Sequence, residues 1–351
     1  MRRIAKRCRF GPVRAGEWTR LRLIVALMVV GITVAPPLQA HPGYASIVVD
    51  ARSGAVIHEF NADHRRQPAS LTKMMTLYLV FEALEKEQLR LDQQLRVSAH
   101  ASRMQATRLG LRRGQTIRVD DAILALITHS ANDAAVVLAE ALGATETNFA
   151  RLMTLKARYL GMPNTRFHNA SGLPDRRQYS CARDMATLGL ALLNDFPRHY
   201  PLFATTHFHY KGRSYRNHNH LLGGYAGSDG IKTGYVRASG FNLVASAKRG
   251  DRRLLAAVLG GQSARSRDRR MVELLDASFR SLAGVKKVVA LAGPPALAAP
   301  RKSAAGIGRI RGREQLSPAI TASAKQVEPA IPNQANASGG VIDGTRSMTG
   351  P

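Results

Sequence analysis

Alternation of apolar and polar residues predicts extended segments in two parts of the chain. Residues 45–50 and 55–60 are short and rich in apolar and β-branched residues, and a turn that contains Gly54 separates them. Residues 240–247 and 253–259 make a second pair of the same kind. We therefore expect two antiparallel pairs of strands, one near each end of the folded region.

Apolar residues at helical spacing occupy the stretches between and after these strands. Residues 70–87 begin with a half that is apolar on nearly every side, which is typical of a buried helix. Asp120 or Asp121 is expected to cap the next helix. The remaining predicted helices cover residues 122–128, 131–142, 184–194 and 271–282. Strands at both ends with helices between them predict an α+β fold.

The first 40 residues have the pattern of a secretory signal. A basic start is followed by an uncharged apolar run of 13 residues at 23–35. A membrane-spanning helix needs roughly 20 apolar residues, so this run is too short to span comfortably. Residues 36–40 complete the pattern, and we expect a signal peptide at 1–40 with cleavage after Ala40. An uncleaved N-terminal anchor is the alternative.

The composition changes again near the other end. Residues 286–351 contain no aromatic residue, and Ala, Gly, Pro and Ser fill 33 of the 66 positions. Such a segment cannot bury enough apolar surface to offset the entropy of ordering it, so we expect a disordered basic tail. We find no amphipathic helix at its end and therefore expect no C-terminal membrane anchor. The folded domain is predicted at 41–285.

The chain of 351 residues has 51 Lys and Arg against 24 Asp and Glu, a formal net charge of +27. The predicted signal carries +7 of this charge, the folded region +14 and the tail +6. Such an excess favours a polyanionic partner. Export argues against nucleic acid, and no nucleic-acid-binding module is recognisable, so the expected partner is the anionic cell envelope. Only two cysteines are present, which excludes a disulfide framework or a cysteine-built metal site.

Ser70-Leu71-Thr72-Lys73 places a hydroxyl and an amine three residues apart at the start of the first predicted helix. Residues at this spacing share a helix face, so Lys73 can reach the Ser70 hydroxyl and, once desolvated, act as its base. The free backbone N–H groups of a helix start would also stabilise an oxyanion. For this motif alone, a serine cap beside a solvated lysine is the simpler alternative.

Two further motifs follow. Ser130-Ala131-Asn132 lies between two predicted helices, where a hydroxyl and an amide can bind a substrate amide and relay a proton. An ordinary helix cap is its alternative. Lys232-Thr233-Gly234 lies on a predicted strand, where Lys and Thr can bind a carboxylate and Gly lets a ligand lie against the strand. A protected edge strand is its alternative.

In this order the three motifs resemble the active-site signature of penicillin-binding proteins and serine β-lactamases. Flanking residues narrow the resemblance to the low-molecular-mass D-alanyl-D-alanine carboxypeptidases, over about residues 43–283. These flanking stretches are Pro68–Thr76, Ser130–Ala135, Asn169–Pro174 and Asp229–Gly234. The resemblance implies a β-lactamase/transpeptidase-like α+β fold, with an antiparallel sheet flanked by helices, an all-helical subdomain that holds Ser130, and an active site between them.

The resemblance also implies catalytic roles. Ser70 would be acylated by the penultimate D-Ala carbonyl of a peptidoglycan stem pentapeptide, with release of the terminal D-Ala. Lys73 would be the general base, and Ser130 would pass a proton to the leaving amine. β-Lactam antibiotics would acylate the same serine, and no metal or organic cofactor is implied.

Substrate binding is implied for a second set of residues. Arg267 belongs to this set, but arginines also stand at 265, 269 and 270, so a solvated basic face is the simpler interpretation of Arg267. The implied set is Asn132 for the substrate amide, Lys232 and Thr233 for the terminal carboxylate, Gly234 beside them, the backbone N–H groups of Tyr235 and Ser70 for the oxyanion, and Arg267 as a further carboxylate ligand.

Some features depart from the family pattern. Thr154 stands where relatives usually have Asn, and Cys181 where they usually have Thr. Both lie outside the three motifs, so we expect them to affect loop geometry or substrate fit rather than catalysis. Cys181 is expected to be a small core residue, not a reactive thiol. The tail replaces the β-rich second domain and anchor helix of many relatives.

Other functions stay open from the residues alone. A β-lactamase of this signature commonly needs a glutamate to activate the deacylating water, and only Glu140 and Glu146 lie between Ser130 and Lys232. Slow release of penicillin is therefore expected. D,D-endopeptidase activity and a non-catalytic basic wall-binding protein are further alternatives. Two histidine pairs have a spacing that metal sites use but are expected to be incidental, at 207 and 209 and at 218 and 220.

Overall fold

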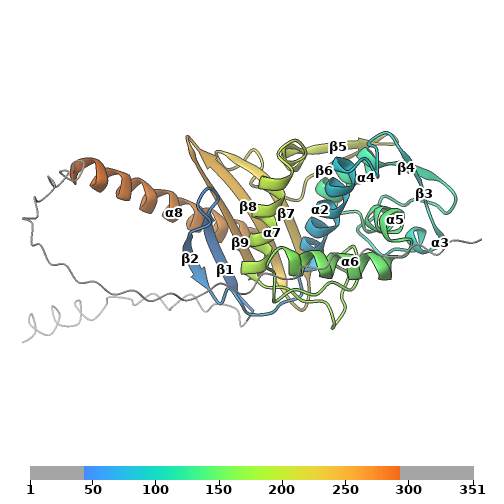
Figure 1. Ribbon diagram of the computed structural model, residues 1–351, viewed down its shortest axis with the longest axis horizontal. Coiled ribbons are helices and arrows are strands. Elements are labelled where there is room, and N and C mark those ends of the chain that lie inside the picture. Colours follow the sequence, from blue (N-terminus) through green and yellow to red (C-terminus); the bar gives the residue numbers. More distant parts are fainter. Residues whose placement is uncertain (1–42, 293–351) are drawn as a thin grey trace, which may run out of the picture. The chain divides into compact units, whose positions relative to one another are not determined.

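The structure, a computed structural model, describes residues 43–292, with side chains to residue 283 (Figure 1). The predicted signal peptide and most of the predicted tail lie outside the described residues. The last helix, α8 (Ala264–Ala292), continues past residue 285, so the first residues assigned to the tail from composition are helical. None of the helices within 43–292 has the length and apolar character needed to cross a membrane.

A five-stranded antiparallel sheet joins the two predicted strand pairs. The order is β2-β1-β9-β8-β7, so the first strand pairs with the last. Ala45 of β1 lies opposite Leu259 of β9, and the pairing continues to Asp50 and Leu254. The strands are β1 (Ala45–Asp50), β2 (Val56–Phe60), β7 (Ser228–Val236), β8 (Gly240–Arg249) and β9 (Arg252–Gly261).

The two faces of this sheet pack on different helices, as Figure 1 shows. Side chains of one face, such as Leu243 and Leu254, join a buried cluster with Met271 and Leu275 of α8. The opposite face belongs to the larger core, which includes α2 (Thr72–Glu85) and α7 (Ala182–Asp195). Successive side chains of a strand point to opposite faces of the sheet, and helices cover both faces here. Consecutive positions are therefore buried, which explains the long apolar runs of β8 and β9.

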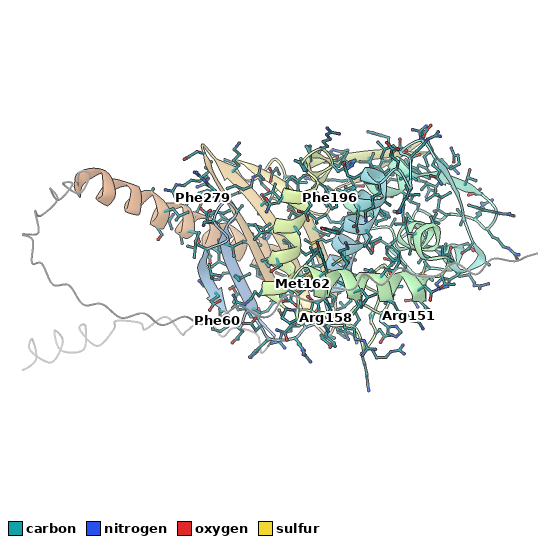
Figure 2. All side chains as sticks on the ribbon, viewed as in Figure 1. Phe60, Arg151, Arg158, Met162, Phe196 and Phe279 are labelled. Carbon is teal, nitrogen blue, oxygen red and sulfur yellow. The ribbon has the colours of Figure 1, made fainter. Side chains whose placement is uncertain are left out.

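Most of the remaining helices lie on the far side of α2 from the sheet, and α6 runs alongside α2 (Figure 1). Arg151 and Arg158 extend outward from α6 in Figure 2, while Phe196 packs edge-on against Tyr78 with ring centroids 4.8 Å apart. These helices are α3 (Ala99–Ser102), α4 (Val119–Thr128), α5 (Asn132–Gly143) and α6 (Glu146–Tyr159). Two small two-stranded sheets are formed by β3 (Gln94–Arg96) with β4 (Thr116–Arg118) and by β5 (His207–Tyr210) with β6 (Arg213–Arg216). Two short 3-10 helices, η1 (Ala69–Leu71) and η2 (Tyr200–Ala204), pack against β7.

One predicted helix start is wrong. Arg118, not Asp120 or Asp121, is the N-cap residue of α4, and its side chain makes no capping bond. Both aspartates lie in the first turn, where their charge favours the positive end of the helix dipole. The two aspartates therefore mark the start of α4 through their negative charge, not through a capping hydrogen bond.

Candidate active site

Ser70 lies in η1, immediately before α2. The side chain of Lys73 points back along the helix toward it, which places Nζ 3.3 Å from Ser70 Oγ. The same ammonium donates to Asn132 Oδ1 at 2.7 Å and to the carbonyl oxygen of Ser171 at 2.5 Å. Lys73 has no exposed surface, so it is not the solvated lysine of the simpler alternative.

Burial changes the chemistry of Lys73. Desolvation, together with the charge of Lys232, holds the pKa of Lys73 well below its usual value near 10.5, and the more distant Asp133 and Glu146 oppose this only in part. A lysine with a lowered pKa has a free amine at a pH where an exposed lysine is protonated. Lys73 can therefore accept the proton of the Ser70 hydroxyl.

Ser130 connects α4 to α5, as predicted, with a φ of 59° that few residues other than glycine adopt. Thr107 braces this turn, because its hydroxyl donates to the Ser130 carbonyl oxygen at 3.0 Å. Ser130 Oγ is buried and has no hydrogen-bond partner within the part of the chain that the structure describes. A buried hydroxyl without a partner is destabilising, and a ligand atom in the cleft would supply the missing bond.

Asn132 and Asp133 join the start of α5 to a neighbouring loop. Besides accepting from Lys73, Asn132 donates through Nδ2 to the Gln105 carbonyl oxygen at 2.9 Å. Asp133 is almost fully buried, and its carboxylate accepts three successive backbone N–H groups at 2.9–3.0 Å, those of Leu109, Gly110 and Leu111. This loop forms one wall of the cleft, so the helix start fixes the wall's position.

The opposite wall is the edge strand β7. Lys232 is fully buried here, and burial together with the charge of Arg267 lowers its pKa to about 7. Gly234 lies so close to the nucleophile that a Cβ on it would be 3.1 Å from the Ser70 nitrogen. Tyr235 is half exposed at the mouth and its ring packs on Phe241, with centroids 4.3 Å apart. The absence of a side chain at Gly234 thus lets strand and nucleophile approach.

Arg267 lies in the first turn of α8 and is only 3% exposed. The interpretation of Arg267 as part of a solvated basic face is therefore wrong. Its Nη1 donates to the Asn242 carbonyl oxygen at 3.1 Å, and its Nε and Nη2 donate to Asp268 Oδ1 at 2.9 and 2.6 Å. A Cβ on Gly261 would be 2.8 Å from Arg267 Cβ, so a glycine at the end of β9 makes room for this side chain.

These residues enclose one cleft of about 440 Å³ between the helical region and β7. Lys73 and Lys232 lie behind its wall, while the other predicted site residues reach its surface. The cleft is lined by Ser70, Ala106, Thr107, Ser130, Asn132, Ser171, Gly172, Leu173, Pro174, His218, His220, Thr233, Gly234, Tyr235, Val236, Phe241, Ala264 and Arg267. The three motifs, distant in sequence, thus meet around a single serine.

Residues 32–263 match the model of a peptidase family described as D-alanyl-D-alanine carboxypeptidase. The chain belongs to this family. It is 39% identical over 243 residues to D-alanyl-D-alanine carboxypeptidase DacC of Escherichia coli, covering 67% of this chain and 61% of that protein. It is 33% identical over 246 residues to DacF of Bacillus subtilis, covering 68% and 63%.

Solved structures agree with the fold. Penicillin binding protein 5 from Haemophilus influenzae superposes with a TM-score of 0.66 and 33% identity, over 70% of this chain and 73% of that one. The β-lactamase/transpeptidase-like α+β fold expected from the resemblance is confirmed. The chain spans a little over three fifths of the length of the first two curated relatives it matches.

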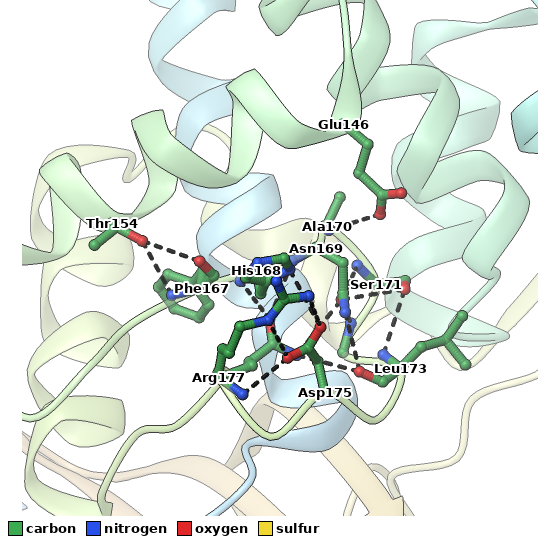
Figure 3. A network of polar contacts seen from close by, with 12 residues as sticks. Glu146, Thr154, Phe167, His168, Asn169, Ala170, Ser171, Leu173, Asp175 and Arg177 are labelled. Carbon is green, nitrogen blue, oxygen red and sulfur yellow. Dashed lines mark hydrogen bonds and ion pairs between the residues drawn. The ribbon is translucent and has the colours of Figure 1, made fainter.

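Residues 169–177 complete the cleft wall, although no residue among them was predicted as a site residue. Figure 3 shows their polar network, in which Asn169 Oδ1 accepts from the backbone of Ser171 at 3.2 Å and of Gly172 at 2.7 Å. This holds the Ser171 carbonyl where Lys73 donates to it. The resemblance to the family included part of this segment. Its contribution to the site is a backbone carbonyl, so no reactive side chain in the sequence indicated a role.

The histidine pairs lie in two different settings. His207 and His209 are exposed on β5, whereas His218 and His220 lie in the loop before β7 and line the cleft. Burial, with Lys232 close by, lowers the pKa of His218 to about 4, so this ring is neutral near pH 7. Residues 218–220 form no strand, because the side-chain oxygens of Asn217 and Asn219 accept the backbone N–H groups two residues further on and hold the backbone in turns. Within residues 43–283 no cluster of three or more His, Cys, Asp or Glu side chains could hold a metal ion.

Both glutamates considered for deacylation are occupied elsewhere. Glu140 accepts from Ser98 Oγ at 2.9 Å. Glu146 accepts from the Ala170 backbone N–H at 3.0 Å (Figure 3). It also contacts His100 Nε2 at 2.7 Å. Neither glutamate lines the cleft. Glu146 supports the wall segment instead of activating a water molecule.

Proposed function

We propose that this protein is a serine-type D-Ala-D-Ala carboxypeptidase that removes the terminal D-Ala from peptidoglycan stem pentapeptides. The observation that carries the proposal is the buried Lys73 amine, 3.3 Å from the Ser70 hydroxyl at the cleft wall. Membership of the carboxypeptidase family and the unpartnered Ser130 hydroxyl support it. Trimming of the pentapeptide removes the donor for cross-linking and so limits it.

Acylation follows from these positions. Ser70 Oγ attacks the penultimate D-Ala carbonyl carbon as Lys73 takes its proton. The backbone N–H groups of Ser70 and Tyr235 stabilise the resulting oxyanion. Ser130 then gives its proton to the leaving amine and takes the proton held by Lys73 in return, the C–N bond breaks, and D-Ala departs. Water hydrolyses the Ser70 ester, which releases the shortened peptide and restores the serine.

Recognition of the terminal carboxylate falls to the β7 end of the cleft. Thr233 and Arg267 line the cleft there, and Lys232 lies directly behind Thr233. Cationic and hydroxyl donors around one pocket favour a carboxylate. Asn132 binds the substrate amide from the opposite wall, and Gly234 leaves room for the peptide to lie against the strand.

β-Lactams acylate Ser70 in the same way and are released slowly. The engagement of Glu140 and Glu146 outside the cleft supports slow release over β-lactamase activity. Endopeptidase activity needs the same serine but a substrate without the small terminal D-Ala. A purely wall-binding role would leave the Lys73–Ser70 arrangement without a purpose.

The enzyme acts outside the cytoplasm, in the periplasm or cell envelope. Support comes from the signal pattern of residues 1–40 and from the substrate class, since stem peptides lie in the envelope. Without the +7 of the predicted signal, the exported chain keeps a net charge of +20, which attracts it to anionic envelope polymers by long-range electrostatics. This attraction is screened by salt.

The test measures D-Ala release from a pentapeptide by the full chain and by Ser70→Ala. The wild type should release D-Ala and label with penicillin, and the variant should do neither. Ser214→Ala, an exposed serine on β6, is the matched control and should behave as wild type. Release that survives in Ser70→Ala would show that the nucleophile is another residue. Penicillin label lost within seconds of a chase, not minutes, would instead indicate a β-lactamase.

A further inference from the structure

Asp268 contacts two cleft-lining side chains at the carboxylate end, Arg267 and His220. Its Oδ1 accepts from Arg267 Nε and Nη2 at 2.9 and 2.6 Å, and its Oδ2 lies 3.2 Å from His220 Nδ1. Arg267 lies in the first turn of α8, and His220 in the loop before β7. A single carboxylate therefore joins two elements that line the cleft but are far apart in sequence.

These contacts fix which N–H groups of Arg267 remain for a ligand. A guanidinium has five N–H bonds. Asp268 takes one on Nε and one on Nη2, and the Asn242 carbonyl takes one on Nη1. One N–H on each of Nη1 and Nη2 has no partner among the residues that the structure describes. Two remaining donors on one guanidinium can serve the oxygens of a carboxylate.

The backbone at the start of α8 fixes the position from which the Arg267 side chain extends. Ser263 and Ser266 bond reciprocally across the start of α8, backbone N–H to hydroxyl in each direction at 3.0 and 3.1 Å. Gly261 lies against the Arg267 Cβ position. The Cα and Cβ atoms of Arg267 are therefore fixed in position, and the orientation of its guanidinium depends on Asp268 and Asn242.

We propose that Asp268 is a positioning residue, whose carboxylate orients the Arg267 guanidinium to bind the terminal carboxylate of the substrate and ties His220 to the same end of the cleft. The proposal rests on the proposed function. An acid at this place would by charge alone repel a carboxylate substrate, so its benefit must come from orientation. Removal of Asp268 should therefore slow the reaction of a carboxylate substrate if Asp268 orients Arg267, and speed it if Asp268 only repels the substrate.

The experiment compares acylation of the full chain by benzylpenicillin and by its methyl ester, which lacks the carboxylate. In Asp268→Ala the rate constant with the acid should fall about tenfold, and that with the ester less than about twofold, because only the acid uses the oriented guanidinium. KM for a pentapeptide should rise by a similar factor with little change in kcat. Asp268→Asn, which keeps the size of the side chain, should give a smaller loss confined to the acid.

Controls separate positioning from folding. Asp268→Glu should recover the acid rate to within about threefold of wild type, since it restores the charged acceptor. Asp276→Ala removes another acid of α8, bonded to Tyr225 and Arg249 away from the cleft, and should leave the acid-to-ester ratio unchanged. In an Arg267→Ala background, Asp268→Ala should cause no further loss of acylation by benzylpenicillin, because no guanidinium is left to orient.

Three results would overturn the inference: equal losses with acid and ester, an unchanged acid rate, or faster acylation by the acid. The last would mean that Asp268 acts only by repulsion. A wild type that neither releases D-Ala nor becomes acylated would overturn the proposed function itself, and that outcome is visible before any variant is made.

Discussion

Gly172 lies directly against the carbonyl of Ala69, so that a Cβ on Gly172 would be 1.8 Å from the Ala69 oxygen and 2.9 Å from the Ser70 nitrogen. Its φ of +85° is also one that side chains disfavour. The segment after α6 and the residue before the nucleophile are therefore in backbone contact. Because Ser70 N–H is a proposed oxyanion donor, the position of this donor depends on a glycine about 100 residues away.

Gly172→Ala should displace the nucleophile. We expect acylation by penicillin to fall at least about 100-fold, because the new methyl group must push the Ala69 carbonyl away and misalign Ser70. Gly161→Ala is the control, since Gly161 has a similar φ of +75° with open space around it. It should lose only about 1–2 kcal/mol of stability from backbone strain and keep its acylation rate. Equal acylation by both variants would contradict the argument.

Replacing Lys73 by arginine should remove the base while keeping a cation. A guanidinium stays protonated, so acylation should fall on the order of a thousandfold. In the wild type, protonation of Lys73 blocks proton transfer, so the rate falls as pH drops through the lowered pKa and is level above it. Stopped-flow acylation across pH should therefore reach its plateau well below pH 10.5. An acylation rate that still rises at pH 10.5 would mean that Lys73 titrates like a solvent-exposed lysine.

The lowered pKa of Lys232 predicts a second pH effect, in which activity falls as the pH rises. With its pKa at about 7, the side chain is cationic below that pH and neutral above it. Attraction for the substrate carboxylate is therefore lost as pH rises, and kcat/KM for a pentapeptide should decline above pH 7, once the Lys73 limb is accounted for. Lys232→Arg should flatten this alkaline decline, since arginine keeps its charge. An alkaline limb that is identical in the variant would assign it to another group.

Asp133→Asn should loosen the loop wall. An amide cannot accept all three N–H groups of residues 109–111, and we expect a loss of roughly 2–4 kcal/mol in unfolding free energy. Urea denaturation measures this loss, and hydrogen exchange should show faster exchange at the three amides. Asp120→Asn breaks a partly exposed pair with Arg118 and should cost under about 1 kcal/mol. Unchanged exchange at these amides would mean that another contact holds the wall.

Cys181 is the N-cap residue of α7, where its sulfur accepts the Asp184 backbone N–H at 3.4 Å. A hydroxyl is a better acceptor, so Cys181→Ser should raise the unfolding free energy by about 0.5–1 kcal/mol, and Cys181→Ala should lower it. Burial raises the pKa of the thiol to about 12, so a thiol reagent should label it only after unfolding. A serine variant no more stable than the alanine variant would show that the cap contributes nothing.

Local spacing predicted the catalytic core well. The i, i+3 relation of Ser70 and Lys73 and the junction that holds Ser130 both depend on a few neighbouring residues, and the structure agrees on both. The family resemblance added the sheet and the helical subdomain. The predicted roles of the site residues remain proposals that the variants above test.

Other features depend on contacts that no local pattern carries. The α6 helix was missed because Leu152, Leu155 and Tyr159 are exposed, which obscures its apolar stripe. Arg267 lies among several arginines in sequence, and only Gly261 and Asn242, brought close by the sheet, make it a buried side chain. His218 reaches the cleft for a similar reason, through turns stabilised by its flanking asparagines.

The pairing of β1 with β9 has a consequence for the order of events during synthesis. At about 5–20 residues per second, the roughly 200 positions between these strands take roughly 10–40 s to make. During that time β1 lacks one of its neighbours, and the nucleophile turn lacks β7 and Arg267. A growing chain therefore carries Ser70 and Lys73 without the strand and guanidinium that complete the cleft. The unfinished chain thus has no complete active site, and one edge of β1 stays unpaired until β9 has been made.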